Sequence, residues 1–348
     1  MESNLFSEIN NATNSIYGIC NITSLVFSSE LSTNTGVKIF LKKEHEQITG
    51  SFKLRGATYK LLKISHEEHN KDKTIVTAST GNHGIATSFA CNKLNELSHS
   101  YDSLTRFKCI IYAPNHVDEL KSSLILQNNA KLIKISTNNC LDAEKTAKEF
   151  ASTEGAFYIS PYNDYDIIAG QGTLGREILN DMENKCDAVF VSIGGGGLIS
   201  GIATYIKNVN PECKVIGCQP YNSRVIYESI KVGKVLQDLP EYDTVSDATA
   251  GGVEDDLLTF PIIENNVDDI ILATEEEIYE AFCMIEETDR ITVEGSAALT
   301  LACLMKTKER WQGRRVVLVL CGKNISIEKI NLMRGYYSKN KISEQIKY

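Results

Sequence analysis

The sequence has no long apolar run, no excess of positive charge and no closely spaced cysteine pairs. No run of about 18 apolar residues occurs, so we expect no membrane-spanning helix. The first residues, from Met1 to Leu5, lack a basic start followed by an apolar stretch, so no signal peptide is expected. The formal net charge of −9 argues against nucleic acid or an acidic membrane surface as a partner.

The ten cysteines are scattered and form neither a C-x-x-C pair nor a Cys/His group with zinc spacing. Reduced thiols in the cytoplasm are therefore the simplest interpretation, because a secreted disulfide framework suits shorter chains. The chain has 348 residues, of which 42% are hydrophobic. This size predicts two domains or one large α/β unit.

From about residue 74 onward, short apolar runs alternate with longer helical patterns. This alternation predicts parallel sheets covered by helices on both faces. The polar stretch 95–107 is interpreted as a surface loop. The expected strands are 74–78, 109–113, 131–135, 156–159, 188–192, 214–218 and 315–320, and the expected helices are 84–94, 117–128, 141–152 and 172–182.

Lys53 lies among small residues in the segment 50–57. Most lysines are solvated surface groups, but Gly50, Gly56 and Ala57 permit close backbone approach, and Phe52 supplies an apolar wall. A lysine that is desolvated in such surroundings has a lowered pKa and becomes a nucleophile, which can form a Schiff base with an aldehyde.

Four consecutive glycines follow the buried run 188–192 and precede a helical pattern. Each costs about 0.5–1 kcal/mol of backbone entropy relative to alanine, which a plain flexible turn does not explain. Backbone amides at a helix N-terminus can hold a phosphate. Pyridoxal phosphate (PLP) carries both an aldehyde and a phosphate, so this loop and Lys53 together suggest a PLP enzyme. The loop residues are Gly194, Gly195, Gly196 and Gly197.

A second loop between a strand and a helix is rich in hydroxyl groups. One of its residues could serve only as a helix N-cap, but the whole set would also hold a substrate carboxylate. For His83 alone, a structural role is favoured over acid–base work. Cys321, at the end of the last apolar strand, could be a plain turn residue or could deliver a side chain to a cofactor. The loop residues are Ser79, Thr80, Gly81, Asn82 and His83.

Taken in order, these motifs resemble the serine/threonine dehydratase and serine racemase family of fold type II PLP enzymes. The resemblance covers nearly the full chain and also includes the segments 160–164 and 168–173. It implies a two-domain, tryptophan synthase β-like α/β fold. A large PLP-binding domain would comprise residues 1–73 and 159–348, and a small domain with the carboxylate loop would comprise residues 74–158. It also suggests a homodimer.

The same resemblance implies a role for each motif. Lys53 would hold PLP as a Schiff base and act as the base at the substrate Cα. Phe52 would flank the ring, and Asn82 would bond the phenolic oxygen of the cofactor. The glycines 194–197 would bind the phosphate, and Cys321 would face the pyridine nitrogen. The loop 79–83 would receive the substrate carboxylate, with Thr80 as a further catalytic candidate.

The function implied is an ammonia-lyase that converts L-threonine or L-serine into a 2-oxo acid and ammonia. Serine racemases in the family carry a serine at the position of Thr80, and dehydratases often carry alanine, so a racemase or a bifunctional enzyme stays an alternative. A substrate such as 3-hydroxyaspartate is a further alternative. Gln219 and Val225 replace the carboxylates of the racemases' divalent-metal site, so no metal is expected there.

Two other functional interpretations have less support from the sequence. A non-catalytic PLP-binding homologue would retain Lys53, Asn82 and the glycines without turnover. A nucleotide-dependent dehydrogenase would need G-x-G-x-x-G with an acidic residue about 20 positions further on, and the four glycines lack that companion pattern.

Overall fold

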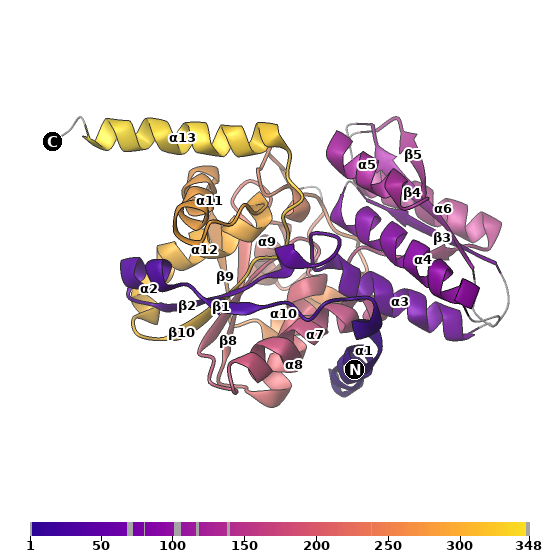
Figure 1. Cartoon of the computed structure of the whole chain (residues 1–348), viewed down its shortest axis with the longest axis horizontal. Coiled ribbons are helices and arrows are strands. Elements are labelled where there is room, and N and C mark those ends of the chain that lie inside the picture. Colours follow the sequence, from indigo (N-terminus) through magenta and orange to yellow (C-terminus); the bar gives the residue numbers. More distant parts are fainter. Residues whose placement is uncertain are drawn as a thin grey trace.

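Two sheets, each flanked by helices, organise the chain (Figure 1). The structure is a computed structural model that describes residues 2–67, 72–79, 81–100, 106–115, 118–137, 140–237 and 239–345. Within these ranges, no helix is long and apolar enough to cross a membrane. The α/β class with parallel sheets, expected from the alternating pattern, is confirmed.

The larger sheet has six strands in the order β1-β2-β10-β7-β8-β9. All neighbours pair in parallel except β1, which is antiparallel to β2 at the edge. Helices α11 and α12 lie on one side of this sheet and α7, α8 and α10 on the other (Figure 1). Its strands are β1 (Leu25–Phe27), β2 (Lys38–Lys42), β10 (Arg315–Val319), β7 (Ala188–Ser192), β8 (Lys214–Pro220) and β9 (Asp269–Ala273).

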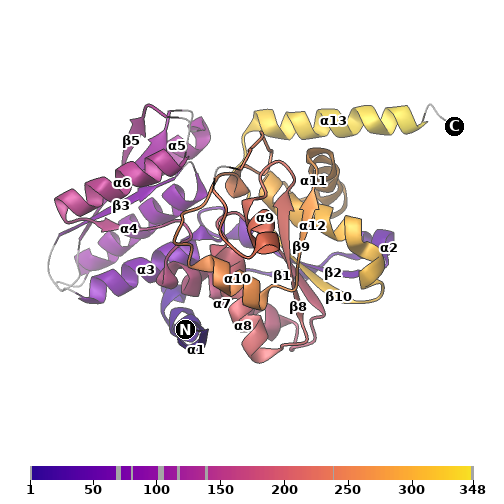
Figure 2. The ribbon, with the colours of Figure 1, turned by 180° about the vertical axis from the view of Figure 1, so that it is seen from behind.

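The smaller sheet has four parallel strands in the order β5-β4-β3-β6. Figure 2 shows α6 on one side of it and α4 on the other. Alanines at every fourth position of α6 pack on this sheet, because residues four apart lie on one helix face. The strands are β5 (Lys131–Ile135), β4 (Phe107–Pro114), β3 (Lys73–Ala78) and β6 (Phe157–Tyr158).

The helices connect and cover the strands. Figure 1 shows α13 extending across the molecule beside α11. The helices are α1 (Glu2–Ser15), α2 (Ser29–Thr35), α3 (Lys53–Glu67), α4 (Asn82–Ser100), α5 (Glu119–Gln127), α6 (Cys140–Glu154), α7 (Tyr165–Asp181), α8 (Gly197–Val209), α9 (Val225–Val232), α10 (Thr259–Asn266), α11 (Glu275–Asp289), α12 (Gly295–Thr307) and α13 (Ile327–Gln345).

The predicted surface loop at 95–107 is wrong in its first part, because α4 continues to Ser100. The side chain of Asn95 explains the difference. Its Nδ2 donates to the carbonyl of Phe107 at 2.8 Å, and its Oδ1 accepts from the Phe107 amide at 2.7 Å. A polar residue therefore anchors the helix to the start of β4 instead of ending it.

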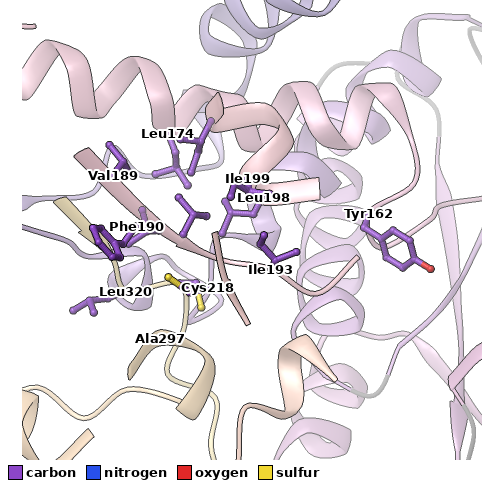
Figure 3. Close-up of a cluster of buried hydrophobic side chains, with 14 of the residues drawn as sticks. Tyr162, Leu174, Val189, Phe190, Ile193, Leu198, Ile199, Cys218, Ala297 and Leu320 are labelled. Atoms are coloured by element: carbon purple, nitrogen blue, oxygen red, sulfur yellow. The ribbon is translucent and has the colours of Figure 1, made fainter. Parts of the chain in front are cut away.

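The main core surrounds β7, every residue of which is buried. Figure 3 shows Val189 and Phe190 of β7 among Leu174 of α7, Ile199 of α8 and Leu320 after β10. A continuous apolar strand is the pattern expected when both faces of a parallel sheet are covered. The packing fixes the carboxyl end of β7, where the glycine loop begins.

Candidate active site

Two adjoining cavities hold every described residue that the sequence suggested for the site. The first, the glycine-loop cavity, is lined by Phe52, Lys53, Asn82, Cys321 and all four glycines 194–197. The second, the α4 cavity, is lined by Lys53, Ser79, Gly81, Asn82 and His83, and also by Gly194 and Gly195. Lys53 and Asn82 face both cavities, so they lie where a cofactor and a substrate could meet. Thr80 lies outside the described residues.

The lysine segment is attached to the segment after β10. Ser51 forms an isolated antiparallel bridge with Gly322, and the Phe52 amide donates to the Cys321 carbonyl at 3.1 Å. These bonds bring Lys53, at the start of α3, beside Cys321 although the two are far apart in sequence. The site is thus assembled across the large sheet by backbone hydrogen bonds.

The Lys53 amine donates to the Pro161 carbonyl at 2.6 Å and lies 5.2 Å from the centre of the Phe52 ring. Burial lowers the pKa of Lys53 to about 8, against the smaller opposing influence of Glu144, Cys321 and Glu294. A lysine with a pKa near neutrality supplies a neutral amine far more readily than an exposed lysine does. This agrees with the nucleophile expected from the sequence.

Packing requires the glycines of the loop. A Cβ on Gly195 would lie 2.3 Å from the Tyr162 ring, and Gly196 adopts φ +88°, where side chains are strained. No backbone amide of residues 194–197 has an acceptor among the described residues, other than within α8. Free amides at the start of a helix form an anion site, so the loop fits a phosphate group.

Asn82 and Cys321 converge on Glu294, which the sequence analysis missed. Asn82 donates its Nδ2 to Glu294 Oε1 at 3.0 Å, and Cys321 Sγ lies 3.7 Å from the same oxygen. Burial raises the pKa of Glu294 to about 7 and that of the Cys321 thiol well above its ordinary value. No local pattern marks Glu294, because it is simply the N-cap residue of α12.

The loop at the start of α4, which the family resemblance assigns to the substrate carboxylate, borders the α4 cavity. The Gly81 amide donates to Ser79 Oγ at 3.0 Å, and a Cβ on Gly81 would clash with Lys121. Burial lowers the pKa of His83 to about 3, so its ring is neutral near pH 7. The Nε2 of His83 lies 3.4 Å from the Ile159 carbonyl, which agrees with a structural role.

Three further charged residues line the α4 cavity and were not suggested by the sequence analysis. Two of them, Lys121 from α5 and Asp247, pair with each other at 3.0 Å. The third, Glu144 from α6, is buried and adjoins Glu254. A signal for any of the three would have required knowledge of the tertiary contacts.

At the position of the racemases' divalent-metal site, the fold engages the side chain of Gln219. Its Nε2 donates to the Ile193 carbonyl at 3.3 Å, and its Oε1 accepts from the Tyr227 amide at 2.7 Å. Val225 is a buried apolar residue at the start of α9. The absence of a metal there stays a prediction from the residue types.

The residues present fit PLP. A buried lysine of lowered pKa suits the aldehyde, and a glycine loop with free amides suits the phosphate. Phe52, Asn82 and Cys321 line the same cavity as these groups.

Comparisons with known proteins agree with this geometry. The family described as "Pyridoxal-phosphate dependent enzyme" matches residues 17–322. The chain is 33% identical to an L-threonine ammonia-lyase of Thermotoga maritima, over 93% of this chain and 76% of the relative. It is 32% identical to a serine racemase of Dictyostelium discoideum, over 89% of this chain and 91% of the relative. The structure of processed threonine deaminase isoform 2 from Solanum lycopersicum superposes with a TM-score of 0.86, at 28% identity, covering 96% of this chain and 93% of that one.

Proposed function

Because the chain belongs to the pyridoxal-phosphate dependent enzyme family, we propose that it is an ammonia-lyase acting on L-threonine, L-serine or both. The reaction would dehydrate and deaminate the amino acid to a 2-oxo acid and ammonia. The observation that carries the proposal is the position of Lys53, whose amine borders both the glycine-loop cavity and the α4 cavity. A base at that position can reach a substrate Cα that lies between cofactor and carboxylate loop.

Bound PLP supplies a conjugated ring that withdraws electrons from the substrate Cα. The chain's own residues would bind the cofactor, orient the substrate and remove the proton. The amides of residues 194–197 would hold the phosphate, and Phe52 would cover one side of the ring. Ser79 and its neighbours at the start of α4 would orient the substrate carboxylate, while Lys53 would take the proton from Cα.

Serine racemase is the second candidate, supported by the Dictyostelium relative and by the hydroxyl group of Thr80. A racemase needs proton donors on both faces of the substrate Cα, and a hydroxyl opposite Lys53 would supply the second. Thr80→Ala would abolish D-serine formation but retain 2-oxo acid release if both reactions occur and Thr80 is that second group.

The decisive assay follows 2-oxo acid release from L-threonine and L-serine with PLP present, together with chiral analysis of the remaining serine. Lys53→Ala should abolish turnover and the Schiff-base absorption, which lies at about 410–420 nm for such imines. Absence of 2-oxo acid from both substrates would refute the ammonia-lyase. Absence of D-serine would refute the racemase.

The division into a large and a small domain also stays a proposal, supported by the separation of the two sheets. The homodimer and the cytoplasmic location are likewise proposed from the family resemblance and the cysteine content. Size-exclusion chromatography with light scattering would test the dimer.

A further inference from the structure

Four buried polar atoms gather beside the α4 cavity: Glu144 Oε2, Glu254 Oε1, Tyr158 Oη and Tyr162 Oη. Glu144 and Glu254 lie close enough to share a hydrogen bond when one of them is protonated, and the two tyrosine hydroxyls lie near them. Glu144 and Tyr162 each retain only 8% of their exposure and both line the cavity. Buried polar groups are normally hydrogen-bonded, so a polar ligand beside Glu144 and Tyr162 would extend this group of hydrogen bonds. We call these four residues the acid cluster.

The acid cluster is assembled from four separate elements. Glu144 comes from α6, Tyr158 from β6, Tyr162 from the segment before α7, and Glu254 from the segment before α10. Figure 3 shows the Tyr162 ring lying apart from the apolar side chains around β7. Tyr162 also packs on Gly195 of the glycine loop, so the acid cluster adjoins the cofactor position.

Only one of the two carboxyl groups is neutralised. Glu254 Oε2 accepts from Lys148 Nζ at 2.6 Å and from Asn163 Nδ2 at 3.0 Å. Among the described residues, Glu144 forms no ion pair; burial and the neighbouring Glu254 raise its pKa to about 7. The acid cluster can therefore accept hydrogen bonds, and can donate one while Glu144 is protonated, but it disfavours a second anion.

The position of the acid cluster corresponds to one substituent of the substrate Cα. The carboxylate belongs at the loop 79–83, and the amine belongs at the cofactor beside Lys53. The remaining charged lining residues, Lys121 and Asp247, already pair with each other. The side chain of the substrate is therefore the group left to face Glu144 and Tyr162.

We propose that Glu144 and its partners in the acid cluster recognise the substrate side chain and select a hydrogen-bond donor, hydroxyl or ammonium, over a carboxylate. This inference rests on the proposed function and narrows its substrate class. It places L-threonine and L-serine ahead of 3-hydroxyaspartate, because a side-chain carboxylate would meet Glu144 and Glu254. Tyr162, which lines the same cavity, would complete the hydrogen bonds to the selected group.

The test uses the PLP-loaded enzyme and two substrates that differ at one group. L-threonine and L-threo-3-hydroxyaspartate share the β-hydroxyl, and a carboxylate replaces the methyl group in the second. Binding is followed by the change in cofactor absorption, and turnover by 2-oxo acid release. The variants are Glu144→Gln, which keeps shape and removes charge, and Glu149→Gln, an exposed glutamate on the same helix, as control.

We expect the wild type and Glu149→Gln to bind threonine at least about tenfold more tightly than 3-hydroxyaspartate. This factor is the one expected from a single charge-assisted interaction. Glu144→Gln should reduce this preference severalfold while its cofactor absorption stays intact. Glu254→Gln should also reduce the preference for threonine. Agreement between the two variants would show that the effect does not come from a folding defect in one of them.

Equal preference in the wild type and Glu144→Gln would overturn the inference, as would equal binding of both amino acids by the wild type. Failure of the proposed function gives a different result. In that case no 2-oxo acid forms from threonine, while the binding preference and its loss in Glu144→Gln remain measurable and still support the role of the acid cluster.

Discussion

Asn82 donates its side-chain amide to both carboxylate oxygens of Glu294, at 3.0 and 2.9 Å. Asn82 begins α4, which covers the smaller sheet, and Glu294 caps α12 on the larger one. Asn324 Nδ2 donates to the Oδ1 of Asn82 at 2.8 Å. The amide of Asn82 is thus held from both ends, and the two sheets are joined by a buried polar contact at the cofactor position.

Asn82→Ala should destabilise the protein by about 1–3 kcal/mol, because it removes both Asn82 hydrogen bonds to the buried Glu294 carboxyl and leaves it the weaker contact with Cys321. It should also weaken PLP binding. Urea unfolding of the cofactor-free protein and a PLP titration would measure the two effects. Asn92→Ala, which removes an exposed hydrogen bond on the same helix, serves as the control. Equal effects of the two substitutions would contradict the structural role of the Asn82 contact.

Much of the fold was predictable because its signals are local. The buried strand β7 is a continuous apolar run followed by glycines, and the structure places a strand on those same residues. The extension of α4 past residue 94 was not predictable, because Asn95 and its neighbours are polar. The bonds that hold Asn95 are made to Phe107, beyond the end of the helix.

The residues of the candidate site also divide into those that the sequence marks and those that only the folded structure reveals. Lys53, the glycines and Asn82 have marked surroundings in the sequence, and the structure brings them together. Glu294 and Glu144 have unremarkable neighbours in the chain. Their pKa values are raised by burial and by side chains far away in sequence, which only the folded arrangement supplies.

Arg55, two residues after Lys53, holds a buried ion network. Its side chain is fully buried; Nε and Nη2 donate to the two oxygens of Glu44 at 2.8 Å, and Nη2 also donates to Glu177 at 3.0 Å. Arg55→Ala should cost about 3–5 kcal/mol, since it leaves two buried carboxylates without their guanidinium. Denaturant unfolding would measure the loss.

Arg314→Ala is the control for that prediction, because the pair of Arg314 with Asp187 is 64% exposed on the arginine side. Exposed pairs contribute about 0–1 kcal/mol. Arg55→Lys should fall between the two, because it keeps the charge but lacks the planar fork. If Arg55→Ala is no more destabilising than Arg314→Ala, the buried network does not stabilise the fold.

Gly195→Ala should impair PLP binding by displacing Tyr162. The added methyl group would lie 2.3–2.6 Å from three carbons of the Tyr162 ring, so the ring or the glycine loop must move. We expect at least about a tenfold loss in PLP affinity, since one lost hydrogen bond to the phosphate accounts for that factor. Gly335→Ala, with nothing within 4 Å, is the matched control and should bind PLP as the wild type does.

Stability should fall with rising pH because of Glu144. Its pKa is raised from an ordinary value of 4.5 to about 7 in the folded protein, by burial and then by Glu254. The folded state therefore binds this proton more tightly than the unfolded state does. The resulting contribution to stability is fully present below pH 4.5 and is lost as the pH rises through 7.

The charged and titratable groups facing Glu144 are Glu254, Lys148 and Lys53, together with the hydroxyls of Tyr158 and Tyr162. Lys148 and Lys53 oppose the shift, and the pKa of about 7 already includes their influence. A rise from 4.5 to about 7 predicts a loss of about 2–3 kcal/mol from this carboxyl between pH 4.5 and 7. Urea unfolding of the cofactor-free protein at several pH values would measure it. Glu144→Gln should reduce the fall in stability over that window and leave the part due to Glu294, whose pKa is also raised to about 7, while Glu149→Gln should follow the wild type. Parallel wild-type and Glu144→Gln profiles would show that Glu144 titrates normally.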